Sequence, residues 1–134
     1  MQILKTKPGT KMASAFFVMV VPNCEYGAEG VFVYADSGVV ENPDSEGLAD
    51  IAIESANSFK QLVQKDPVVA MLSYSTYGSA KSELTEKVIQ ATRLAKEKAK
   101  KAAEQKVKRE ALAKKREEER AEKDRNRAEL DAKE

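Results

Sequence analysis

The residues that make turns and cores are confined to the first part of this chain. All six Gly, all four Pro and all eight aromatic residues of the 134-residue sequence lie at or before Gly78. Beyond Gly78 nothing forces a helix to break, and residues 96–134 hold only three large apolar side chains, Val107, Leu112 and Leu130. A packed core with turns is therefore predicted for the first two-thirds of the chain only.

Charge separates along the sequence in the same way. Residues 1–90 hold 7 Lys, no Arg and 11 acidic residues, a net charge of −4, whereas residues 91–134 hold 16 basic and 11 acidic residues, a net charge of +5. The total of +1 therefore hides two segments of opposite sign. In the basic segment acids alternate with bases and no aromatic side chain is available for base stacking. This pattern favours a solvated helix over a nucleic-acid interface.

Composition excludes several classes of protein. No run of about 18 apolar residues could span a membrane, and the N-terminus lacks the charged, apolar and small-residue order of a secretory signal. The single cysteine, Cys24, cannot form an internal disulfide, so we expect a cytoplasmic protein. With no His, the chain cannot complete a Ser-His-Asp triad. A metal site would need carboxylates almost alone, so none is predicted.

Hydrophobic patterning predicts a partial α/β fold. β-Branched and aromatic residues favour strands over about 12–21 and 30–36, joined as an antiparallel hairpin by a loop too short for a parallel return. Apolar residues at three- and four-residue steps predict a helix over about 43–64. A buried strand is expected over about 67–74, parallel to an earlier one, and a further helix over about 82–96.

Capping residues refine these helices. Asn42 is the predicted N-cap of the first helix, with Pro43 in its first turn. Ser82 followed by Thr85 predicts the start of the second. From residue 97 a long charged single helix is expected to follow, supported by acid-before-base pairs at four-residue spacing, each worth about 0.2–0.5 kcal/mol. These pairs are Glu97–Lys101, Glu104–Lys108, Glu110–Lys114 and Glu119–Lys123.

One loop could bind an anion. Ser73, Ser75, Thr76 and Gly78 follow the predicted strand and precede a helix N-terminus, a place where hydroxyls and free N–H groups can hold a phosphate or carboxylate. On composition alone, a loop whose hydroxyls cap its own backbone is the better interpretation. Asp36 before a turn is similarly interpreted as a turn former, and Cys24 beside Glu25 as an unreactive thiol.

The assembled segments closely resemble the phosphate acetyltransferase family (phosphate acetyl/butyryl transferases). The resemblance is collinear over residues 1–96 and is most specific from Val69 to Thr76 with Gly78 and Ser79. It implies a two-domain α/β enzyme with its active site in the cleft between the domains. It also implies that acetyl-CoA and phosphate are interconverted with acetyl phosphate and CoA, without a further cofactor. Within that resemblance, Ser73, Ser75, Thr76 and Gly78 are the expected substrate-binding residues.

The resemblance also stops. The family's preceding domain and its late Ser-Arg and Asp segment have no counterpart in this sequence, so no catalytic residue is carried over. Residues 1–96 are therefore predicted to be a central fragment of the enzyme domain, and residues 97–134 a charged helical extension without its own core. The isolated chain is expected to be inactive and to self-associate through uncovered sheet edges. The alternative is a non-catalytic interaction module that presents a charged helix.

Overall fold

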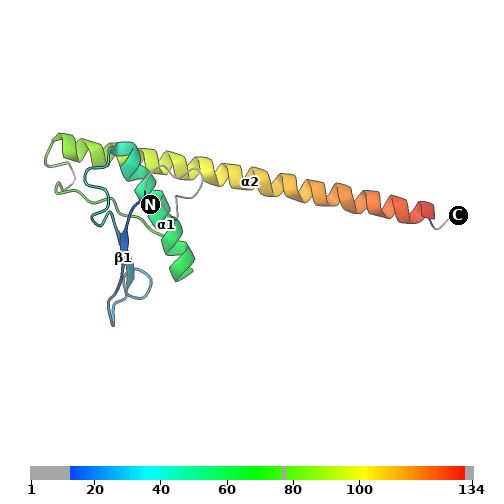
Figure 1. Cartoon of the computed structure of the whole chain (residues 1–134), viewed down its shortest axis with the longest axis horizontal. Helices are drawn as coiled ribbons and strands as arrows, with labels where there is room; N and C mark the ends of the chain where they lie inside the picture. Colours follow the sequence, from blue (N-terminus) through cyan, green and yellow to red (C-terminus); the bar gives the residue numbers. More distant parts are fainter. Residues whose placement is uncertain (1–12, 77, 132–134) are drawn as a thin grey trace. The chain divides into compact units, whose positions relative to one another are not determined.

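A computed structural model describes residues 13–76 and 78–131 of the chain. It divides into two compact units, residues 1–97 and 98–134. The elements follow the order β1 (Phe16–Val20), β2 (Val31–Ala35), α1 (Ser45–Val63) and α2 (Glu83–Asp131), and Figure 1 shows them along the chain. The predicted class, a partial α/β fold ending in a long helix, is confirmed.

β1 and β2 form the antiparallel hairpin that the sequence predicts. Phe16 lies opposite Ala35 and Val20 opposite Val31, and the Val21 N–H donates to the Gly30 carbonyl at 2.9 Å just beyond the last pair. Gly30 has a φ of +87°, and a Cβ built there would lie 2.2 Å from the Val21 carbonyl oxygen. Only glycine therefore fits where the loop re-enters the ladder.

The N-cap of α1 lies two residues later than the sequence predicts. Asp44, not Asn42, is the N-cap residue, because its side chain accepts a 2.7 Å hydrogen bond from the Gly47 N–H. Asn42 instead accepts a 2.8 Å hydrogen bond from the Lys87 ammonium group, on the first turns of α2. Pro43 precedes the helix and is buried. Both Asx residues suit a helix start, and the structure uses Asp44.

The predicted strand over 67–74 is wrong in this structure. Residues 65–72 run without helix or strand and make no backbone–backbone hydrogen bond with another described residue. The sequence is suited to a strand, but a strand exists only when a neighbouring backbone completes its ladder. The described part of the chain provides a two-stranded sheet and no pairing for this segment.

α2 starts where the sequence predicts. Ser82 and Thr85 bond reciprocally: the Ser82 N–H donates to Thr85 Oγ1 at 2.9 Å, and the Thr85 N–H donates to Ser82 Oγ at 3.3 Å. This is a capping box with Thr in the place of Glu. α2 then continues without a break to Asp131. The predicted helices over 82–96 and beyond are thus one helix.

The core of the first unit is thin. Its buried apolar residues are Ala49, Ile51 and Ala52 of α1 and Ala91 of α2. Ser45 Oγ donates to Gln90 Oε1 at 3.0 Å alongside them, so the small side chains mark where α1 and the start of α2 approach closely. No large side chain is fully buried among the described residues. Much of the unit's apolar surface therefore has no cover from the described part of the chain.

Candidate functional site

The serine-rich loop predicted to bind substrate is a hydrogen-bonded turn. Ser73 Oγ accepts from the Ser75 N–H at 3.2 Å, and Ser75 Oγ accepts from the Ala80 N–H at 3.0 Å. The Tyr74 hydroxyl and Ser82 Oγ lie 2.5 Å apart, which joins the loop to the N-cap of α2. Thr85 is 2 % exposed beneath it, with Oγ1 2.9 Å from the Ser82 carbonyl oxygen.

The four predicted binding residues differ in whether their polar groups remain free to bind a ligand. Ser73 and Ser75 use their hydroxyls within the loop. Thr76 contributes its carbonyl, which accepts from the Ser79 N–H at 3.0 Å, and its exposed side chain has no hydrogen-bond partner among the described residues. Gly78 has a φ of +77°, a conformation that favours glycine. The structure therefore brings the four together in one turn and leaves Thr76 as its available hydroxyl.

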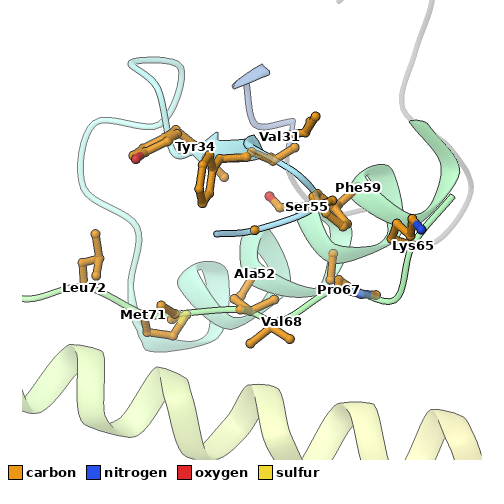
Figure 2. Close-up of a pocket in the computed structure, with 18 of the residues that line it drawn as sticks. Val31, Tyr34, Ala52, Ser55, Phe59, Lys65, Pro67, Val68, Met71 and Leu72 are labelled. Atoms are coloured by element: carbon orange, nitrogen blue, oxygen red, sulfur yellow. The ribbon is translucent and has the colours of Figure 1, made fainter. Parts of the chain in front are cut away.

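The residues that directly precede this loop line an open groove of about 950 Å³, which the sequence did not predict. Four segments line the groove: the hairpin loop between Glu25 and Glu29, β2 with Asp36 after it, one face of α1, and residues 65–72. Figure 2 shows Val31 and Tyr34 on one side, Ala52, Ser55 and Phe59 on α1, and Val68, Met71 and Leu72 on the other. The lining ends at Leu72, so none of the four predicted binding residues lines it.

One wall of the groove has a signal in the sequence. The three- and four-residue spacing that predicts a helix over about 43–64 defines an apolar face with Leu48, Ile51, Ala52, Ser55 and Phe59. In the structure this face borders the groove, although Ile51 and Ala52 are themselves buried. Periodicity identifies an apolar face but does not say which segment covers it.

Charged groups stand among the apolar lining. Glu25, Glu29, Asp36, Lys65 and Asp66 contribute to the lining of the groove. Lys60 on α1 holds the pKa of Asp66 below its usual range, through a 2.7 Å hydrogen bond from its ammonium group and the accompanying charge attraction. Within residues 13–76 and 78–131 no group of three or more His, Cys, Asp or Glu side chains could hold a metal ion.

In the part of the chain that the structure describes, no helix combines the length and the apolar character needed to cross a bilayer.

Comparison with known proteins gives a consistent result. The family described as phosphate acetyl/butaryl transferase matches residues 1–106. The phosphate acetyltransferase of Acetivibrio thermocellus is 72% identical over 99 residues, which are 74% of this chain and 30% of that protein. The phosphate acetyltransferase of Thermoanaerobacterium thermosaccharolyticum is 56% identical over 95 residues, 71% of this chain and 29% of that protein.

A solved structure shares the fold. The EutD phosphotransacetylase from Staphylococcus aureus matches with a TM-score of 0.65 and 42% sequence identity, over 76% of this chain and 29% of that one. The chain thus spans about 30% of the length of these relatives.

Proposed function

Because the chain belongs to the phosphate acetyl/butaryl transferase family, we propose that it is a piece of an acyltransferase that interconverts acetyl-CoA and phosphate with CoA and acetyl phosphate. The observation that carries the proposal is the 72% identity to a phosphate acetyltransferase over 99 residues. The 99 matched residues are 74% of this chain, so the match supports a shared role in the enzyme as well as a shared fold.

The chemistry sets out what such an enzyme must provide. The CoA thiolate attacks the acetyl carbonyl of acetyl phosphate, the C–S bond forms, and the C–O bond to phosphate breaks as phosphate leaves. Cationic groups that hold the phosphate, and a base that takes the thiol proton, would supply most of the rate. The resemblance gives the family's Ser-Arg and Asp segment no counterpart in this sequence. We therefore assign to this chain the scaffold and one wall of the site.

Within that site we assign the turn holding Ser73, Ser75, Thr76 and Gly78 to substrate contact. Thr76 is the residue that offers an exposed hydroxyl, while Ser73 and Ser75 hold the turn in shape. A hydroxyl can donate to a phosphate oxygen at the modest strength of a single neutral donor. The expected consequence of losing it is weaker substrate binding rather than complete loss of turnover.

A chimera tests both assignments. The segment of this chain that matches the Acetivibrio thermocellus enzyme replaces its 99-residue equivalent, and acetyl-CoA formation from acetyl phosphate and CoA is followed. We expect an active chimera in which Thr76→Val raises KM about three- to tenfold. Ser14→Ala is the control: Ser14 is exposed and distant in sequence from Thr76, so KM should stay the same. A folded but inactive chimera would contradict the proposed function, and an unchanged KM would contradict the role of Thr76.

The isolated 134-residue chain is expected to lack this activity, because the charged groups of the reaction are not among its residues. The assay is the same, with purified chain in place of the chimera and the Acetivibrio thermocellus enzyme as positive control. Turnover by the chain that follows its concentration and survives a second purification step would overturn this expectation.

Self-association through the outer edge of β1 is the remaining part of the proposal. Phe17 and Val20 are 63% and 68% exposed, and the edge of β1 away from β2 is unpaired in the two-stranded sheet of the described residues. An apolar edge of this kind pairs readily with another copy. Sedimentation should show concentration-dependent oligomers that Val18→Pro reduces. A monomer at all concentrations would contradict this.

A further inference from the structure

Part of α2 carries its cations on one side. α2 is a single unbroken helix, as Figure 1 shows, so residues seven apart, which are nearly two turns apart, lie on the same side of it. Lys101, Lys108 and Lys115 form one such row, and Arg109 and Arg116 form an adjacent row. We name these five residues the basic stripe.

The acidic residues of this stretch lie at the margin of the basic stripe or on the other side of the helix. Glu110 is on the other side, where it pairs with Lys106 at 3.8 Å. Glu104 lies at the margin, one turn from Lys101 and from Lys108. It forms no ion pair with either of them in the described part of the chain. No acid therefore neutralises the stripe between residues 101 and 116.

The basic stripe has no partner within the described chain. All five side chains are exposed, and none forms an ion pair with another described residue. A row of like charges repels itself and attracts a surface of opposite charge. Most of the stripe lies beyond residue 106, where the match to the family ends, so the proposed acyl transfer does not account for it.

The length and composition of the stripe select one kind of polyanion. From residue 101 to residue 116 a helix rises about 22 Å, and duplex DNA presents one phosphate charge per roughly 1.7 Å of its axis, about a dozen over that length. The large apolar side chains of this stretch are Val107 and Leu112, which are too few for insertion into lipid. No aromatic residue follows Gly78, so the bases of a single strand have nothing to stack on.

We propose that the basic stripe binds the phosphate backbone of duplex nucleic acid without reading its sequence. Over residues 91–134 as a whole, alternating acids and bases favour a solvated helix. Along the continuous helix, however, five of the bases fall together on one side. The stripe lies in the second unit and the serine-rich turn in the first, so duplex binding and acyl transfer can be tested separately.

Fluorescence anisotropy with the full chain and a labelled DNA duplex of about 20 base pairs measures this binding. Five phosphate contacts predict a slope of about −4.5 for the logarithm of the affinity against that of the salt concentration. The affinity should therefore fall about 500-fold between roughly 50 and 200 mM salt. A second duplex of unrelated sequence should bind equally well, because the contacts are to the backbone.

Two triple variants test the stripe itself. The stripe variant combines Lys101→Gln, Lys108→Gln and Lys115→Gln, and it should weaken binding at least tenfold at about 50 mM salt and make the slope shallower by about 3. The matched control combines Lys100→Gln, Lys106→Gln and Lys114→Gln. It removes the same charge from the same stretch but off the stripe, so binding should weaken less than about threefold. Glutamine keeps helix propensity, and circular dichroism should show equal helix content in both variants.

Salt-dependent duplex binding that the stripe variant weakens and the control preserves supports the basic stripe. Absence of binding at low salt, or binding that salt does not weaken, would overturn the proposal. Equal weakening by the two variants would also overturn it, because net charge alone would then explain the binding. Vesicles of neutral lipid with about 30% phosphatidylserine are the second probe. Binding to these vesicles without binding to the duplex would assign the stripe to a membrane surface and overturn the proposed partner.

Discussion

The two units of this chain are stabilised in different ways. In the first, residues distant in sequence contact one another: Ser45 bonds to Gln90, Asn42 to Lys87, and Ala49 and Ala91 are fully buried. In the second, every described side chain from residue 99 to 123 is exposed. Its order comes from the helical backbone and from neighbours one turn away.

The ion pairs of the second unit show how weak that local support is. The structure joins Lys106 and Glu110 at 3.8 Å, with the base before the acid, the less favourable order on a helix. The four acid-before-base pairs predicted from spacing are not within ion-pair distance in the described residues. Exposed Lys and Glu side chains lose rotamer entropy when they pair, so spacing alone does not fix their contacts.

Gly30→Ala should produce the largest loss of stability and confine it to the first unit. The new Cβ would lie 2.2 Å from the Val21 carbonyl oxygen, and φ is already +87°. We expect the free energy of unfolding to fall by about 3 kcal/mol, measured by urea denaturation. Gly38→Ala is the control, since φ is +82° there but no atom lies within 4 Å; about 1 kcal/mol is expected. Equal losses would contradict the steric argument.

Thr85→Val should cost about 1–3 kcal/mol, because it leaves the half-buried Ser82 N–H without its acceptor. The matched control is Thr92→Val on the same helix, where Oγ1 donates to the Val88 carbonyl at 2.8 Å. That carbonyl already serves the helix, so little change is expected. Thermal unfolding followed by circular dichroism compares the two. If Thr92→Val were the more costly, the capping box would not be what holds this end of α2.

Ala113→Gly should weaken only the second unit, by about 1 kcal/mol of local helix stability. Ala113 is exposed and has no tertiary contact to lose, so ellipticity at 222 nm should fall while the unfolding midpoint of the first unit stays constant. Ala113→Gln, which keeps helix propensity, is the control. A shifted midpoint in the first unit would show that the two units are energetically coupled.

The smallest expected effect on stability comes from breaking the ion pair between Lys60 and Asp66. The pKa of Asp66 is lowered chiefly by the hydrogen bond from Lys60 and then by the charge of Lys60. The pair therefore contributes its stability above the ordinary carboxyl pKa and loses it as pH falls through the lowered value. Carboxyl carbon NMR should show Asp66 titrating below the usual Asp range, and Lys60→Gln should return it there. The midpoint should barely move, because the pair is exposed.

Local sequence signals predicted the elements well. The Ser82–Thr85 start of α2, the hairpin and both helices follow from residue type and spacing. The segment 67–74 shows the limit: its apolar run is that of a strand, but pairing needs a partner that no local pattern supplies. Residue type also did not choose between Asn42 and Asp44 as N-cap, because both side chains suit that position.

The predicted binding turn was only partly specified by its sequence. Small hydroxyl residues predicted a turn. In the structure a hydrogen bond from the Ala80 N–H to Ser75 Oγ closes it. Which hydroxyl stays available, that of Thr76, depended on the pattern of bonds inside the turn. The groove had only a partial signal in the sequence, the apolar face of α1, because its walls come from segments that are distant in the sequence.

Sequence alone therefore determined where the chain can form helix and hairpin, where its core-forming residues end, and which family it resembles. Those properties reside in residue type and short spacing. Tertiary structure decided which apolar faces are covered and which backbone edges stay unpaired. These properties depend on contacts between distant segments, which residue type and short spacing do not specify.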